Sequence, residues 1–346
     1  MSSDYLSAGV DIEAGEETVK RITPIVQSTF QPGVLTDIGG FGGLFDLSKS
    51  SFKDPVLVAA TDGVGTKAEI ARLTKRFGTI GRDLVAMCVD DLVCIGATPL
   101  FFLDYVAVGN LNPEIVEQLV TGIAEGCREA KCALIGGEMA EHPGVMQNDQ
   151  FDLVGFAVGA VERNSLLDGS ASHPGDILIA IESPNLRSNG YSLARHVLLE
   201  KAGLSLDQPA WVGAKNSLAD ELLSPSVIYS PAVTDALNKH DIHAIAHITG
   251  GGLEKNLSRV LNNKVNAVID TNTCTVPNIF QEIQKHGNIS DYEMQQVFNM
   301  GVGMVLAVTH DNTDELIQTL DSHNKNAWVI GELVDGLGVS HSLILP

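Results

Sequence analysis

Short apolar runs alternate with helical patterns throughout the first half of the chain. Apolar and β-branched runs predict strands at 56–61, 100–108, 132–136 and 152–161. Apolar residues at helical spacing predict helices at 81–95 and 112–131. In the second of these, Asn112 is a suitable N-cap, and Pro113 suits the first turn.

A polar, Gly- and Pro-containing segment at 163–176 interrupts this pattern and predicts a domain boundary. The same alternation then restarts. We expect strands at 177–182, 243–248, 265–269, 302–309 and 327–332, and helices at 191–202, 230–240, 253–261, 277–286 and 313–323. The fold class expected is therefore α+β, with two mixed α/β domains at 1–168 and 169–346.

The charge balance limits the classes of ligand. The 346 residues include 22 basic and 43 acidic side chains, a net charge of −21. Nucleic acid and anionic membranes are poor partners for such a surface, whereas a small phosphorylated ligand held with Mg²⁺ fits it. No apolar run reaches 18 residues, so we expect no membrane span. Five cysteines without a C-x-x-C pair, and an acidic start at 1–17 unlike a signal peptide, predict a reduced, cytoplasmic protein.

Two common phosphate-binding fingerprints are missing from the sequence. Neither G-x-x-x-x-G-K-[ST] nor G-x-G-x-x-G occurs, which disfavours an ordinary P-loop NTPase or Rossmann dehydrogenase. What remains is a set of glycine-rich loops that carry acids. The first is segment 39–43, where backbone N–H groups of Gly40, Phe41 and Gly42 can surround an anion. The alternative for this segment is a flexible surface turn.

The second loop follows the strand at 56–61. Asp62 can hold Mg²⁺ there, while Lys67 meets a phosphate. The alternative is that Asp62 caps a helix and Lys67 points into solvent.

Acids inside the apolar helix at 81–95 form the third candidate. Asp83 and Asp90 share one face, and we expect Asp83 to be solvated. Asp91 interrupts the apolar stripe, and an ionised carboxylate facing a core is costly unless it is paired or metal-bound. Asp91 is therefore the acid of interest. Glu138 and Glu141, after the strand at 132–136, could complete a carboxylate metal site or lie in an exposed loop.

Two loops in the second half place small residues before a predicted helix. Ser188, Asn189 and Gly190 precede one helix; Thr249, Gly250 and Gly251 precede another. Free N–H groups at a helix N-terminus favour phosphate. His247 comes just before the second loop, where it is either a catalytic residue or a histidine of the core.

Six strings resemble one enzyme family, the phosphoribosylformylglycinamidine cyclo-ligases, also called aminoimidazole ribonucleotide synthetases. The segment 91–99 also fits the D-x4-G-A-x-P signature of a wider ATP-binding superfamily that includes thiamine-monophosphate kinase. The similarity covers nearly the whole chain. The strings are TDGVGTK at 61–67, DLVCIGATP at 91–99, GIAEGC at 122–127, GGEMAE at 136–141, SNGYS at 188–192 and AHITGGG at 246–252.

The resemblance implies a homodimer in which the N-terminal sheets pair into a barrel. It also implies ATP-dependent ring closure of formylglycinamidine ribonucleotide in purine synthesis, with Mg²⁺ as cofactor. By resemblance, Asp62, Lys67 and His247 are the catalytic candidates, and Asp62 and Asp91 the metal ligands. The ATP-binding candidates are Gly40, Phe41, Gly42, Asp62, Gly63, Lys67, Asp91, Glu138 and Glu141; those for the substrate and its phosphate are Arg187, Ser188, Asn189, Gly190, His247, Thr249, Gly250 and Gly251.

One position departs from the family pattern, because Arg187 stands where the family usually has His before S-N-G-Y-S. A permanently charged guanidinium cannot accept a proton, but it can bind a phosphate with two parallel hydrogen bonds. We therefore expect Arg187 to contact phosphate in an active enzyme. The alternatives are another ATP-dependent enzyme of the superfamily, such as thiamine-monophosphate kinase, or a nucleotide-binding regulator without turnover.

Overall fold

The computed structural model describes residues 5–336, which divide into two compact units. One unit comprises the residues up to Leu92 together with Pro99–Arg163 and Leu223–Ile228. The other comprises Val93–Thr98, Asn164–Leu222 and the residues from Tyr229 onward. The main division thus falls at the start of the polar segment 163–176. Two short segments are exceptions: Val93–Thr98 belongs to the second unit, and Leu223–Ile228 belongs to the first.

The first unit contains a four-stranded sheet in the order β1-β4-β2-β3. Its strands are β1 (Pro55–Gly63), β2 (Thr98–Val108), β3 (Ala133–Glu141) and β4 (Phe151–Glu162). β1 and β4 are antiparallel, whereas β2 and β3 are parallel and joined by a helical crossover.

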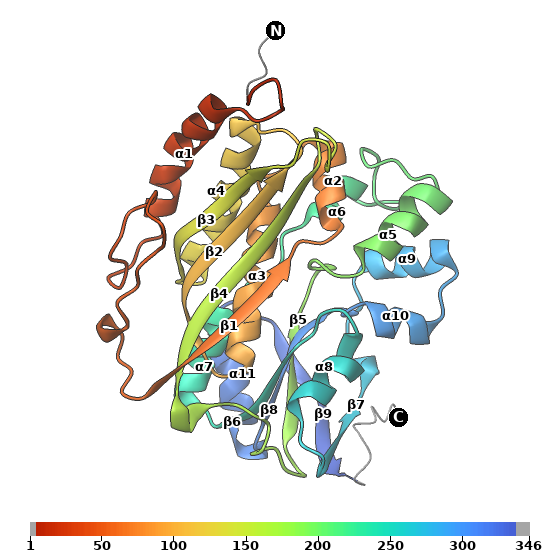
Figure 1. The fold of residues 1–346 in the computed structure, drawn as a ribbon. Coiled ribbons are helices and arrows are strands. Elements are labelled where there is room, and N and C mark those ends of the chain that lie inside the picture. Colours follow the sequence, from red (N-terminus) through yellow and green to blue (C-terminus); the bar gives the residue numbers. More distant parts are fainter. Residues whose placement is uncertain (1–4, 337–346) are drawn as a thin grey trace. The chain divides into compact units, whose positions relative to one another are not determined.

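The helices α3 (Ile80–Cys94) and α4 (Pro113–Glu129) lie behind this sheet in Figure 1. Their backbones approach closely, since a Cβ added at Gly81 would lie 2.4 Å from the backbone N of Ile123. Under α3, Gly155 of β4 leaves room for Phe102 and Cys88. The opposite face of the sheet exposes Leu57 and Phe156.

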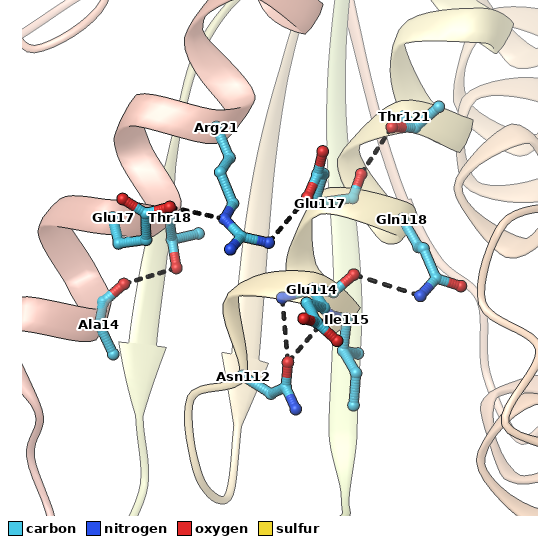
Figure 2. Close-up of polar contacts among 10 residues, drawn as sticks. All are labelled: Ala14, Glu17, Thr18, Arg21, Asn112, Glu114, Ile115, Glu117, Gln118 and Thr121. Carbon is cyan, nitrogen blue, oxygen red and sulfur yellow. Dashed lines mark hydrogen bonds and ion pairs between the residues drawn. The ribbon is translucent and has the colours of Figure 1, made fainter.

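Two further helices, α1 (Ile12–Gln27) and α2 (Lys67–Thr74), complete the main helices of this unit. Figure 2 shows how α1 is joined to α4: Arg21 binds Glu17 at 2.8 Å and Glu117 of α4 at 3.2 Å. As predicted, Asn112 caps α4 by accepting hydrogen bonds from the backbone N–H groups of Glu114 and Ile115.

The second unit is built on a five-stranded antiparallel sheet in the order β6-β8-β5-β9-β7. Its strands are β5 (Ile177–Glu182), β6 (Ile242–His247), β7 (Val265–Ile269), β8 (Val302–Val308) and β9 (Ala327–Asp335). Its helices are α5 (Tyr191–Arg195), α6 (Leu218–Leu223), α7 (Ser230–Lys239), α8 (Gly252–Val260), α9 (Asn278–Gly287), α10 (Asp291–Val297) and α11 (Thr313–Ser322). Leu178 and Ala180 of β5 share a buried cluster with Leu257 of α8, while α11 packs against β5 and β9.

Several element boundaries differ from the sequence prediction. β1 continues through Asp62 and Gly63, and β3 continues to Glu141, because both segments pair with neighbouring strands. The helix expected at 191–202 is α-helical only to Arg195 and continues as a π-helix over His196–Lys201. α1 was not predicted; Pro24 inside it and its many charges weaken the sequence signal. In the described part of the chain, no helix combines the length and apolar character needed to cross a membrane.

Candidate functional site

A cleft of about 660 Å³ opens in the first unit beside the glycine-rich segment 39–43. The cleft brings together Gly40, Phe41, Gly42 and Glu138, which the sequence predicted as ATP-binding residues. The Phe41 ring is wholly exposed. Segment 39–43 therefore forms one wall of a cleft and is available to a ligand.

Asp104 also lines this cleft, although the sequence analysis did not single it out. It lies on β2 directly opposite Gly137 of β3, and burial raises the pKa of its carboxyl to about 7. A Cβ at position 137 would lie 1.7 Å from Asp104 Oδ1, so the glycine makes room for this carboxyl. The signal that could have found it is an acid in the middle of an apolar strand, the same argument applied to Asp91.

Asp62 and Asp91 both act on the Cys88 thiol through their negative charges. Burial raises the pKa of Cys88, and the negative charges of Asp62 and Asp91 raise it further. Asp62 is half-buried at the end of β1, and its Oδ1 accepts a hydrogen bond from the backbone N–H of Gly63 at 2.7 Å. Carboxylates with access to solvent are the hard oxygen ligands that Mg²⁺ prefers, so the chemistry of Asp62 and Asp91 fits the metal.

The orientation of α3 differs from the prediction. Asp83, expected to be solvated, is completely buried, as is Asp90, whereas Asp91 is exposed. The expectation that Asp91 faces the core is therefore wrong. Every residue from Asp83 to Asp90 is buried, so this part of α3 lacks the exposed polar face from which its rotation could be predicted.

Lys67 is also completely buried, so the alternative that it points into solvent is wrong. Its Nζ lies 2.7 Å from Asp83 Oδ2 and donates a hydrogen bond to the backbone carbonyl of Ser224 at 2.9 Å. Asp83 Oδ1 in turn accepts hydrogen bonds from the N–H and hydroxyl of Ser226, at 2.8 and 2.6 Å. The phosphate contact predicted for Lys67 requires this buried ion pair to open.

The two glutamates of β3 have different surroundings. Glu138 is exposed at the cleft, and its Oε1 accepts a hydrogen bond from the N–H of Met139. The two carboxylate oxygens of Glu141 accept hydrogen bonds from the backbone N–H groups of Asp11 and Leu111, at 2.9 and 2.8 Å. Glu138 is thus available to a ligand, while Glu141 ties the start of α1 to the end of β3.

The two predicted phosphate loops of the second unit are neighbours. A Cβ added at Gly250 would lie 3.5 Å from Oδ1 of Asn189, and one added at Gly190 would lie 2.2 Å from the ring of Phe298. Gly190 and Gly251 have φ angles of +74° and +98°, which favour glycine. The structure therefore brings together the loops around Ser188 and Thr249 that the sequence assigned to one ligand.

Side-chain hydrogen bonds hold the second of these loops at the start of α8. Asn256 donates to the carbonyl of Gly252 at 2.7 Å. In the first loop, the hydroxyl of Ser188 is buried and makes no hydrogen bond within residues 5–336. His247 is 5% exposed at the end of β6, where it pairs with Met304. Such burial is typical of a histidine of the sheet; its catalytic role stays a prediction.

Arg187 is not at an open loop surface. Its side chain has no exposed area, and its guanidinium carbon lies 4.8 Å from the centroid of the Tyr229 ring. The backbone of Arg187 has φ +60°, and its N–H donates to Asn185 Oδ1 at 2.9 Å. The cation stacked on an aromatic ring stabilises the loop, and the phosphate contact expected of Arg187 stays a prediction.

Comparisons with known proteins place this fold and these loops in a family. Models of the "AIR synthase related protein" N-terminal and C-terminal domains match residues 50–161 and 173–343. The chain therefore belongs to the AIR synthase related family. Among curated relatives, the phosphoribosylformylglycinamidine cyclo-ligase of Geotalea daltonii is 52% identical over 95% of this chain and 94% of its own. That of Bacillus cytotoxicus is 46% identical over 98% of both chains.

Solved structures of other enzymes share the fold at low identity. Thiamine-monophosphate kinase from Stenotrophomonas maltophilia matches with a TM-score of 0.70 at 20% identity, covering 93% of this chain and 96% of its own. The hydrogenase maturation protein HypE in complex with ATP matches with a TM-score of 0.65 at 16% identity, covering 91% and 86%. At these identities the likeness establishes the fold alone.

Proposed function

We propose that this chain catalyses the ATP-dependent cyclisation of formylglycinamidine ribonucleotide to aminoimidazole ribonucleotide, a step of purine biosynthesis. The observation that carries the proposal is the 46–52% identity to cyclo-ligases over at least 95% of the chain. The structural likeness to thiamine-monophosphate kinase, at 20% identity, supports the shared fold and not that enzyme's activity.

The chemistry needs an activated leaving group, because a formamide oxygen leaves poorly. ATP transfers its terminal phosphoryl group to that oxygen, and the amidine-side nitrogen then attacks the activated carbon. The carbon–nitrogen bond closes the ring and phosphate leaves, so the products are aminoimidazole ribonucleotide, ADP and phosphate. Positioning and neutralisation of charge account for most of the catalysis in such a transfer.

The first unit supplies the groups suited to ATP. Residues of the 39–43 segment and Glu138 line one cleft, and the charges of Asp62 and Asp91 both act on Cys88. Mg²⁺ bound by Asp62 and Asp91 would neutralise phosphate charge during transfer. Lys67, in our interpretation, positions the segment 224–226 through Asp83 while that ion pair is closed.

The second unit supplies the groups suited to the substrate's phosphate. The buried hydroxyl of Ser188 and the adjacent loops at 188–190 and 249–251 offer donors at one place. His247 remains the candidate for proton transfer beside them.

The direct test is to incubate the purified protein with ATP, Mg²⁺ and formylglycinamidine ribonucleotide and to follow both ADP and aminoimidazole ribonucleotide by chromatography. We expect the two products in equal amounts and no reaction with thiamine monophosphate. ADP without the ring product, or turnover of thiamine monophosphate, would support the alternative enzyme. Nucleotide binding without either product would support a regulator.

We also propose a homodimer formed through the open face of the four-stranded sheet. Leu57 is 60% exposed and Phe156 46% exposed on that face, and a second copy would cover both. Pairing of two such sheets would close a barrel. Light scattering should give twice the chain mass, and Phe156→Lys should produce monomers; a monomeric wild-type protein at micromolar concentration contradicts the proposal.

Residence in the cytoplasm follows as a further proposal. All five cysteines lie in the described part of the chain as free thiols, four of them buried, which suits a reducing compartment. Fractionation of the source cells would check it, with the protein expected in the cytoplasmic fraction.

A further inference from the structure

Three side chains outside the proposed site meet near the start of β5: His173, Asp176 and His243. A tight turn holds the first two together, because the N–H of Asp176 donates to the carbonyl of His173 at 3.2 Å. The N–H of His173 donates to Asp176 Oδ2 at 3.0 Å. The backbone of Asp176 is fixed to β9 by a hydrogen bond from the N–H of Leu333 at 2.8 Å. The turn is therefore anchored to the sheet.

The third side chain comes from a β-bulge in the edge strand β6. Ile242 pairs with Val308 and Ala244 with Ala307, which leaves His243 as the extra residue. A bulge redirects a side chain relative to the regular alternation of a strand. Here it accompanies a buried imidazole, 5% exposed, whose Nδ1 lies 2.8 Å from Asp176 Oδ2.

The donor atoms have the spacing of a small metal site. His173 Nδ1 lies 3.2 Å from Asp176 Oδ1, and one ligand atom from each residue lies within 4.8 Å of the other two. Zn²⁺ bonds of about 2.0 Å in a tetrahedron place neighbouring ligand atoms roughly 3.3 Å apart. The Asp176 side chain is completely buried, yet its Oδ1 accepts no hydrogen bond within residues 5–336. A buried carboxylate oxygen in this position is suited to a cation.

The geometry points to a divalent transition-metal site, suited to Zn²⁺, formed by His173, Asp176 and His243. Two imidazoles and one carboxylate leave a fourth position for water, and the half-exposed His173 ring provides the entry path. Asp241 Oδ2 lies 3.6 Å from His243 Nε2, where its carboxylate can orient the ring whose other nitrogen would bind the metal. On binding, His173 Nδ1 exchanges its 3.2 Å contact with the carbonyl of Pro174 for the metal.

This site would tie the turn before β5 to the edge strand and thereby stabilise the second unit. The test uses the whole chain without a histidine tag, stripped of metal with a chelator and titrated with Zn²⁺ by calorimetry. We expect one tight site per chain and a higher melting temperature with Zn²⁺. His173→Ala should weaken that binding at least tenfold. His196→Ala is the matched control, because His196 is an exposed histidine whose Nδ1 lies 2.8 Å from Glu200 Oε2.

A second probe separates metal ligation from simple hydrogen bonding. Co²⁺ should give visible absorption bands of four-coordinate intensity in the wild-type protein and in His196→Ala, and these should be lost in His173→Ala. Asp241→Asn should weaken Zn²⁺ binding by roughly tenfold or more while keeping the Co²⁺ bands. The proposal is overturned if Zn²⁺ does not bind at about ten micromolar, or if His173→Ala binds it as tightly as the wild-type protein.

Discussion

Asp104 and Gly137 lie directly opposite each other on β2 and β3, and the carboxyl of the first occupies the space that a side chain at the second would need. A Cβ at position 137 would lie 1.7 Å from Asp104 Oδ1. The absence of a side chain at Gly137 therefore allows the Asp104 carboxyl to occupy its position in the cleft.

We predict that Gly137→Ala displaces Asp104, lowers stability by about 1–3 kcal/mol and reduces turnover. Gly136→Ala is the matched control, because a Cβ there meets only Leu103 Cδ2 at 3.4 Å. Urea unfolding and the ATP-dependent assay measure the two effects. Equal behaviour of the two variants would show that Asp104 does not need the space.

Asp104 should also make stability depend on pH. Its folded pKa of about 7 is above its ordinary value of 3.8. Between those values the folded protein keeps a proton that the unfolded chain releases, so the contribution of Asp104 to stability is greatest below pH 4 and is lost as the pH rises through 7. The slope is at most about 1.4 kcal/mol per pH unit.

Asp104→Asn removes this titration. As the pH rises from 5 to 8, the free energy of unfolding of the variant should therefore increase relative to that of the wild-type protein by at least about 1 kcal/mol. Unfolding midpoints at four pH values measure the difference. Parallel curves for the two proteins would mean that the carboxyl is not buried in solution.

Lys67→Met should destabilise the fold by about 3–5 kcal/mol, because it leaves Asp83 buried without its cation. Adding Asp83→Asn to the same protein should restore part of the loss, which a double-mutant cycle measures. A stable Lys67→Met protein with a raised KM for ATP would instead identify Lys67 as a phosphate ligand.

Asp91→Asn should lower turnover strongly while the unfolding midpoint barely changes, since Asp91 is exposed and is proposed to hold Mg²⁺. Glu125→Gln, at an exposed acid of α4, is the control. Raising the Mg²⁺ concentration should rescue part of the activity. Full turnover of Asp91→Asn at ordinary Mg²⁺ concentrations is the result that contradicts the assignment.

Arg187→Ala should lower the free energy of unfolding by about 1–3 kcal/mol, because it removes a buried cation from the Tyr229 ring and leaves a cavity. Arg187→His should remain active. A large rise in the KM for the nucleotide substrate, with an unchanged unfolding midpoint, would favour a direct phosphate contact instead.

The sequence located most elements because their signals are local. α4 carries its own N-cap in Asn112 and an apolar face, and β4 lies between polar turns. The carboxylates of α3 could not be placed in the same way. Asp83 is buried because Ser226, 143 positions along the chain, supplies its hydrogen bonds. No periodicity in a single helix reports such a partner.

The candidate site residues fall into two groups, those that line the cleft and those that contact other parts of the protein, and the sequence alone does not distinguish the two. Gly40, Gly42 and Glu138 line one cleft, and their expected ATP-binding role stays a prediction. Lys67, Glu141 and Arg187 look like ligand contacts in sequence but make internal contacts. A charged side chain is typical of both roles, and only the identity of its neighbours separates them.

The segment Leu223–Ile228 has a practical consequence for dissecting the protein. Cutting the chain in the polar linker at 168 would separate the first sheet from the residues that accept from Lys67 and donate to Asp83. A fragment ending there would keep the Lys67–Asp83 ion pair but lose the hydrogen bonds that residues 224 and 226 make to it. The N-terminal half should therefore fail as an independent folding unit until a peptide containing residues 223–228 is supplied in trans.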